Sequence, residues 1–212
     1  ELLDKASGAG VNVPEPLAMN STRDEYGDTR SVTMVMSHMR GYEPIGNAWG
    51  NYNLSDSTPL MVKRNVLREF RRLHLEGIAH NDIHGGNIMW HPRSKKVGLI
   101  DFGYATIIDM PGRHRHNGKD GVTGVMMELN RLQEFVGLDR RYVHREYGGA
   151  LSLLRDRAQA VADGNYRGWE AYELSVHRVH DVLERDLLAD VSRPRSRMIS
   201  DVRQIKIVGL NR

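Results

Sequence analysis

The chain reads HNDIHGGN at residues 80–87 and DFG at residues 101–103, and these two stretches decide how the rest is interpreted. Each is a short polar segment beside apolar residues, and polar loops on a rigid scaffold are where chemistry is usually found. Asp82, Asn87 and Asp101 offer oxygen ligands, which suit a hard cation such as Mg²⁺. Phosphoryl transfer needs such a cation, together with a carboxylate that orients the attacking hydroxyl. The two stretches therefore favour magnesium-dependent phosphoryl transfer.

Outward from these stretches, the sequence predicts a mostly helical body. Thr58 is expected to cap a helix that has Pro59 at its first position, carries an apolar stripe from Leu60 to Leu75, and ends at Gly77. The other expected elements are strands at 17–20, 32–36 and 97–100, a linker with a short helix at 41–57, a loop at 111–119, and helices at 122–136, 139–162 and 168–188.

Composition excludes several classes of protein. The chain has 212 residues, of which 40% are hydrophobic and 27% charged, as in ordinary globular domains. It has no cysteine, so disulfides, thiolate nucleophiles and cysteine-based zinc sites are excluded. The net charge of +3 comes mainly from residues 192–212, which hold six basic residues and one acidic residue. Such a tail could contact an acidic partner.

The spacing of Asp82 and Asn87, followed by DFG at 101–103, resembles the catalytic and metal-binding loops of the protein-kinase-like superfamily. The resemblance covers roughly residues 11–137. It implies an α+β fold with a mostly helical C-lobe and, in this chain, a truncated N-lobe. It also implies that Asp82 is the catalytic base, that Asn87 and Asp101 are magnesium ligands, and that His80 supports the loop.

The same resemblance implies a nucleotide site. Residues 32–36 and the Ser-His-Met that follows are similar to the strand and hinge that hold adenine. Met36 would be the gatekeeper, the backbone of Ser37 and Met39 would hydrogen-bond the base, and Met89 would lie under the ring. ATP and Mg²⁺ are the cofactors that this implies.

Departures from the family pattern indicate an atypical, compact kinase. Asn81 stands where an arginine usually reads a phosphorylated activation loop. His84 stands in place of the catalytic-loop lysine, as in aminoglycoside phosphotransferases, and we count it with Asp82 as catalytic. The His-Asn-Asp opening also resembles choline-kinase-like enzymes and some bacterial effector kinases. No Ala-Pro-Glu triplet and no G-x-G-x-x-G loop with a following strand lysine occur. Asp120 is expected to brace the catalytic loop.

These observations give one expectation and two alternatives. Residues 1–40 are expected to form a partial N-lobe and hinge, 41–191 a kinase-like C-lobe, and 192–212 a basic C-terminal tail. The expected function is ATP- and magnesium-dependent phosphorylation of serine or threonine in proteins. A small-molecule hydroxyl kinase and a non-catalytic, kinase-fold scaffolding module stay open. We expect no membrane span and no nucleic-acid partner, and a cytoplasmic location, or the host cytosol if the protein is an effector.

Overall fold

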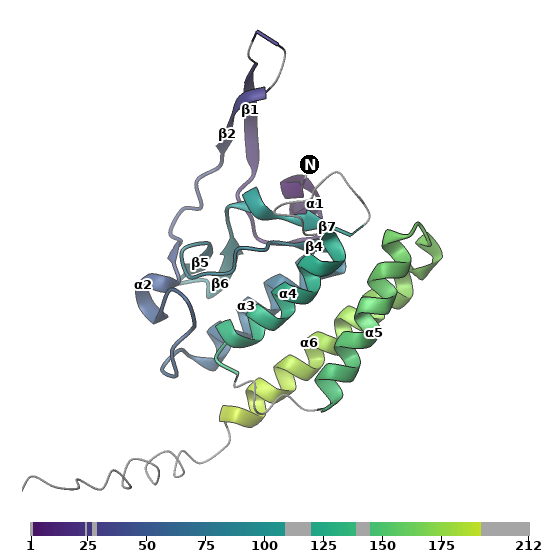
Figure 1. The fold of residues 1–212 in the computed structure, drawn as a ribbon. Helices are drawn as coiled ribbons and strands as arrows, with labels where there is room; N and C mark the ends of the chain where they lie inside the picture. The colour runs from purple at the N-terminus through teal and green to yellow at the C-terminus, as the bar shows by residue number, and fades with distance from the viewer. Residues whose placement is uncertain (1, 24, 27–28, 109–119, 139–144, 192–212) are drawn as a thin grey trace, which may run out of the picture.

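The computed structural model describes residues 2–23, 25–26, 29–108, 120–138 and 145–191 (Figure 1). The expected loop at 111–119 and the expected tail at 192–212 lie outside these residues. Helices and small sheets share the structure, which agrees with the predicted α+β class. The helices are α1 (Leu2–Gly8), α2 (Gly46–Trp49), α3 (Leu60–Leu75), α4 (Gly121–Phe135), α5 (Arg145–Ala162) and α6 (Trp169–Val191). The strands are β1 (Pro16–Arg23), β2 (Thr29–Met36), β3 (Glu43–Pro44), β4 (Ile78–Ala79), β5 (Ile88–His91), β6 (Lys96–Leu99) and β7 (Thr106–Ile107).

The helices α3, α4, α5 and α6 form the main body. α3 packs on α6, α6 pairs with α5, and α5 contacts α4 (Figure 1). The amphipathic α3 has Val66, Phe70 and Leu73 fully buried. Burial of each such side chain stabilises the fold by about 1.5–3 kcal/mol. This stripe, predicted from the sequence, therefore fixes α3 in the body directly before the loop that carries Asp82.

The strands form three small antiparallel sheets. β1 and β2 form a hairpin that projects from the body (Figure 1). β3, β5 and β6 form a second sheet, and β4 pairs with β7. The β5–β6 hairpin joins the two polar loops, since Ile88 lies opposite Leu99 and the N–H of Ile100 donates to the Asn87 carbonyl at 3.0 Å. Residues distant in sequence are thereby brought to one end of this hairpin.

The ends of several elements differ from the sequence expectation. Pro59 itself is the N-cap of α3, with extended backbone (φ −56°, ψ 136°), so the prediction of Thr58 as the cap is wrong by one position. Thr58 is buried instead. The strands β1 and β2 are longer than the apolar runs that predicted them, because their outer residues pair through the backbone whatever their side chains.

The described helices include none that combines the length and the apolar composition needed to cross a membrane.

Candidate active site

His80 connects the two polar loops. Its Nε2 lies 2.8 Å from the carbonyl oxygen of Ile100, and its Nδ1 lies 3.3 Å from the backbone nitrogen of Asp82. A carbonyl oxygen can only accept and a backbone N–H can only donate, so this geometry assigns the ring proton to Nε2. The ring is buried, and its centroid lies 4.9 Å from that of Phe102. One side chain thus holds the loop that carries Asp82 against the loop that carries Asp101.

Asp82 lies between two polar neighbours of its own loop. The Asn87 Nδ2 donates to Asp82 Oδ2 at 2.8 Å and to the Asp82 carbonyl at 3.2 Å. His84 Nε2 lies 3.5 Å from the same Oδ2. The Gly86 N–H donates to His84 Nδ1 at 3.0 Å, which leaves Nε2 to carry the proton that faces the carboxylate. About a third of the Asp82 side chain stays exposed. Asp82 is therefore oriented and still accessible.

Asp101 holds a left-handed backbone conformation (φ 62°, ψ 74°), and its Oδ1 accepts the N–H of Gly103 at 3.2 Å. Asn81 has φ 64°, so two of the three described non-glycine residues with positive φ lie in the two polar loops. Asn and Asp tolerate this region best, and such conformations cluster at functional sites. The unusual backbone therefore marks the same two loops as the motifs do.

The donor set fits a magnesium ion. The Asn87 amide nitrogen is engaged with Asp82, which leaves its oxygen for a cation, and the Asp101 carboxylate is exposed. Among the described residues, no group of three or more His, Asp or Glu side chains could enclose a metal alone. Mg²⁺ is usually held by one or two protein oxygens together with substrate phosphates and water. Asn87 and Asp101 would be its protein ligands here.

A glutamate that sequence reasoning missed braces the catalytic loop. Glu128 of α4 is buried; its Oε1 accepts the N–H of His80 at 3.0 Å, and its Oε2 accepts the N–H of Asn81. Oε1 also lies 2.9 Å from His74 Nε2. Asp120, expected in this role, caps α4 instead, accepting the Thr123 N–H at 2.7 Å. The available signal was an acidic residue on the buried stripe of an apolar helix.

Asn81 binds the segment that follows DFG. Its Nδ2 donates to Thr106 Oγ1 at 2.9 Å and to the Tyr104 carbonyl at 3.1 Å. α4 crosses close to this point, since a Cβ on Gly124 would lie 2.4 Å from Thr106 Oγ1 and 3.1 Å from Asn81 Oδ1. The family pattern has an arginine at this position that binds a phosphorylated activation loop. Here the Asn81 amide instead binds Tyr104 and Thr106, without a phosphate group.

The first glycine of the Gly85-Gly86 pair has a steric reason. A Cβ on Gly85 would lie 2.6 Å from Gly46 Cα and 2.7 Å from the Gly50 carbonyl oxygen. The N–H of Gly46 donates to the Gly85 carbonyl at 2.9 Å. The segment around α2, predicted as a linker with a short helix, therefore fixes the far side of the catalytic loop.

The predicted nucleotide contacts lie around the end of β2. The Ser37 N–H donates to the Glu15 carbonyl at 2.8 Å, and the Met39 carbonyl accepts the Tyr42 N–H at 3.1 Å. In the described part of the chain, the Ser37 carbonyl and the Met39 N–H take no backbone partner. Met36 is 41% exposed. The assignment of these residues to a base stays a prediction.

Two of the predicted methionines lie on one face of the β5–β6 hairpin. Met89 is directly opposite Gly98, and opposed residues of an antiparallel pair share a face. A Cβ on Gly98 would lie 2.4 Å from the Met39 Cε. The structure therefore brings Met39 and Met89 together over this glycine.

A sequence model of the lipopolysaccharide kinase (Kdo/WaaP) family matches residues 1–140. The chain belongs to this family. The Kdo/WaaP match includes both polar loops and α4, and it confirms the predicted membership of the protein-kinase-like superfamily. It also supports the prediction that the chain is a kinase. α5 and α6 follow the matched residues.

Two curated kinases show weaker likeness to this member of the Kdo/WaaP family. The probable serine/threonine-protein kinase FPV212 of fowlpox virus is 30% identical over 95 residues, which are 41% of this chain and 31% of the viral protein. The ribosomal protein S6 kinase alpha-2 of Mus musculus is 29% identical over 86 residues, which are 39% of this chain and 12% of the mouse kinase. The matches thus span about a third or less of each relative.

Proposed function

We propose that this chain transfers phosphate from ATP to an alcohol in a magnesium-dependent reaction. The observation that carries the proposal is the connected set of Asp82, Asn87 and Asp101. Asn87 Nδ2 lies 2.8 Å from Asp82 Oδ2, and the Asn87 carbonyl accepts the N–H of the residue before Asp101. A base and two cation ligands on one hairpin meet the needs of phosphoryl transfer, which is mainly positioning and charge stabilisation.

Asp82 acts as the base of this reaction. Its carboxylate accepts the proton of the acceptor hydroxyl, whose oxygen bonds to the γ-phosphorus while the bond from that phosphorus to the β–γ bridging oxygen breaks. The products are ADP and a phosphate monoester. Asn87 and Asp101 would hold Mg²⁺, which would offset the charge on the phosphate oxygens. His84 Nε2, 3.5 Å from Asp82 Oδ2, keeps the carboxylate oriented.

The experiment measures phosphate transfer from labelled ATP by the whole chain, with and without Mg²⁺. Asp82→Asn is expected to lower kcat by about 10²–10⁴-fold, the usual contribution of a positioned base. Asp101→Asn is expected to weaken the response to Mg²⁺. Asp156→Asn, on the exposed side of α5, is the matched control. Unchanged transfer in both site variants would refute the proposal, and absence of magnesium-dependent nucleotide binding would favour a non-catalytic scaffold.

For the acceptor, we propose serine or threonine in proteins. The viral and mouse relatives are named as kinases of this kind or of a ribosomal protein, which supports the choice. The family's name favours a second candidate, a saccharide hydroxyl of lipopolysaccharide. Parallel assays with a serine/threonine peptide library and with lipopolysaccharide separate them. Transfer to lipopolysaccharide alone would replace the first candidate with the second.

A further inference from the structure

Asn12 binds the outer edge of β6 with both its backbone and its side chain. In the β3-β5-β6 sheet, β6 is at the edge, so the backbone groups of Val97 and Leu99 that face away from β5 need other partners. The Leu99 N–H donates to the Asn12 carbonyl at 2.9 Å, and Asn12 Nδ2 donates to the Val97 carbonyl at 2.8 Å. A single residue thus takes the place of a neighbouring strand beside the strand that leads to Asp101.

The second hydrogen of the Asn12 amide connects this edge to the segment after β2. Asn12 Nδ2 also donates to the Tyr42 hydroxyl at 2.6 Å. The Tyr42 N–H donates to the Met39 carbonyl at 3.1 Å, which closes a turn at 39–42. The Tyr42 ring meets the ring of His91 edge-on, with 5.0 Å between the centroids. The turn that contains Met39 is therefore held to both strands of the β5–β6 hairpin.

Gly98 permits this close approach. A Cβ at this position would lie 2.4 Å from Met39 Cε, 2.9 Å from the Asn12 carbonyl oxygen and 3.1 Å from Asn12 Nδ2. A side chain here would push both residues away from the hairpin. Met89, predicted to lie under a nucleotide base, is opposite Gly98 in the sheet. Asn12 is therefore packed at the same point of the hairpin as two of the predicted base contacts.

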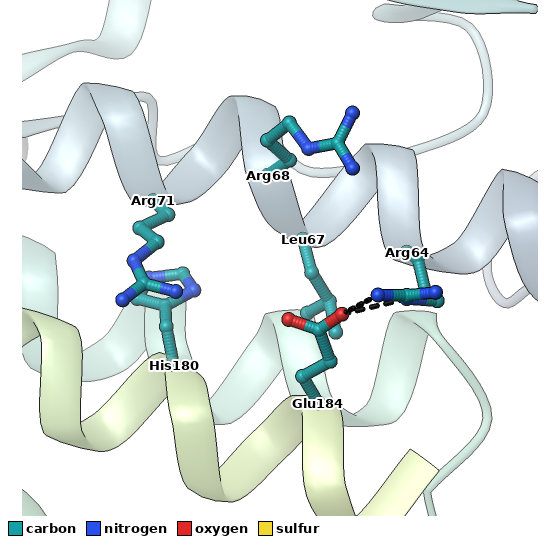
Figure 2. A pocket seen from close by; sticks show the side chains of 6 residues that line it. All are labelled: Arg64, Leu67, Arg68, Arg71, His180 and Glu184. Carbon is teal, nitrogen blue, oxygen red and sulfur yellow. Dashed lines mark hydrogen bonds and ion pairs between the residues drawn. The ribbon is translucent and has the colours of Figure 1, made fainter. Parts of the chain in front are cut away.

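The backbone of Asn12 is also fixed on α3. Its N–H donates to Glu69 Oε2 at 3.1 Å, and the Glu69 side chain is buried. α3 in turn is held on α6, where Arg64 Nε lies 2.6 Å from Glu184 Oε1 (Figure 2). Asn12 consequently connects three parts of the fold: α3, the edge of β6 and the turn at 39–42.

We propose that Asn12 is a positioning residue of the nucleotide site, which through Tyr42 fixes the turn that carries Met39 against the hairpin that leads to Asp101. Met39 is the predicted donor to the base and Asp101 a predicted magnesium ligand, so this role rests on the proposed function. Asn12 acts through the turn and not on the reacting atoms. Loss of the Asn12–Tyr42 hydrogen bond lowers the fraction of molecules whose turn is ready to bind the base, and the apparent Kd rises by the same factor.

The test compares the binding of two ligands to the whole chain by calorimetry, each with Mg²⁺. One is adenylyl imidodiphosphate, a non-hydrolysable ATP analogue. The other is tripolyphosphate, which has no base and reports on the metal end of the site alone. Tyr42→Phe removes the hydroxyl and keeps the ring. It is expected to raise the Kd of the ATP analogue about fivefold, as for loss of one hydrogen bond, and to leave the Kd of tripolyphosphate unchanged.

A kinetic measurement gives a second readout of the same variant. In the transfer assay, Tyr42→Phe is expected to raise the KM for ATP about fivefold with kcat unchanged, because the hydrogen bond acts on binding of the base and not on the chemical step. A general loss of folded protein would instead lower the apparent kcat.

Further variants separate positioning from general stability. Tyr166→Phe removes an exposed hydroxyl outside these contacts and is expected to bind both ligands like the parent. Asn12→Ala is expected to weaken binding of the ATP analogue at least as much as Tyr42→Phe. Adding Tyr42→Phe to Asn12→Ala should cause no further loss, because both substitutions remove the same hydrogen bond.

The possible outcomes distinguish this role from the proposed function. Equal loss of affinity for both ligands in Tyr42→Phe, or no loss for either, would overturn the positioning role and leave the proposed function standing. Additive effects of the two substitutions would overturn the connection through Tyr42. If the parent binds neither ligand with Mg²⁺, the proposed function and the positioning role both fail.

Discussion

The carboxylate of Glu128 lies 3.0 Å from the backbone nitrogen of His80, so a side chain of α4 holds the start of the catalytic loop. Its second oxygen accepts the next N–H, and His74 contacts the first. Glu128→Ala leaves these buried donors without an acceptor. We expect it to lower the free energy of unfolding by about 3–5 kcal/mol, as when one partner of a buried pair is removed. Urea denaturation measures the change.

Glu128→Gln tests which oxygen matters. The amide retains one acceptor but places a donor opposite a backbone N–H. The free energy of unfolding of Glu128→Gln should therefore lie between those of the parent and of Glu128→Ala. Glu170→Gln, exposed at the start of α6, should change stability by less than about 0.5 kcal/mol. Equal stability of Glu128→Ala and the parent would show that the brace contributes nothing.

Gly124→Ala tests the close crossing of α4 and the catalytic loop. The added Cβ would lie 2.4 Å from Thr106 Oγ1 and 3.1 Å from Asn81 Oδ1. Overpacking of this kind costs about 1–3 kcal/mol, and displacement of Asn81 should also lower phosphate transfer. Thermal unfolding and the transfer assay measure the two effects.

Gly148→Ala is the matched control for that substitution. Gly148 also lies within a helix, α5, but a Cβ there would meet nothing within 4 Å. Because Ala is the better helix former, we expect a gain of about 0.5–1 kcal/mol with unchanged transfer. Loss of stability in both variants would mean that the crossing is not the cause.

Asn81 allows backbone strain to be separated from side-chain bonding. Asn81→Gly removes the amide but accepts the positive φ, whereas Asn81→Ala removes the amide and strains the backbone. Both should be less stable than the parent, and the alanine variant should be less stable than the glycine variant by about 1 kcal/mol. Chemical denaturation of the three proteins measures this, and the reverse order would contradict the left-handed assignment.

His180 predicts a pH dependence of stability. Its pKa is held well below 6.5 in the native protein by burial, by His74, by Arg71 and by His177. Below about pH 6.5 the unfolded chain therefore binds a proton that the native chain does not, so stability falls as the pH falls. For one proton the slope approaches about 1.4 kcal/mol per pH unit.

The measurement compares urea denaturation of the parent and His180→Gln between about pH 5.5 and 7.5. Burial raises the pKa of the Glu69 carboxyl against the opposing Asn12 N–H and Arg72, so Glu69 contributes with the opposite sign. Both proteins contain Glu69, and the difference between them isolates His180. A flatter profile is expected for His180→Gln, and parallel profiles would contradict the lowered pKa.

The periodicity of apolar residues predicted the elements that depend mainly on their own sequence. The apolar stripe of α3 and the apolar runs of the later helices appear near their predicted positions. The two-residue strands β3, β4 and β7 carry no pattern of their own, because they exist through pairing with residues distant in sequence. The same is true at the site. The spacing of the two motifs predicts Asp82, Asn87 and Asp101 as site residues, and this stays a prediction. Glu128 was missed because its backbone partners are 47 and 48 residues away.

The His80 ring imposes a condition on any substitution at that position. The buried, planar ring donates a hydrogen bond through Nε2 to the Ile100 carbonyl and accepts one at Nδ1 from the N–H of Asp82. No other side chain presents a donor and an acceptor on opposite corners of a rigid ring. The two loops consequently behave as one body with a set spacing. Movement elsewhere, such as in the β1–β2 hairpin, would therefore leave the spacing between the loop that carries Asp82 and the loop that carries Asp101 unchanged.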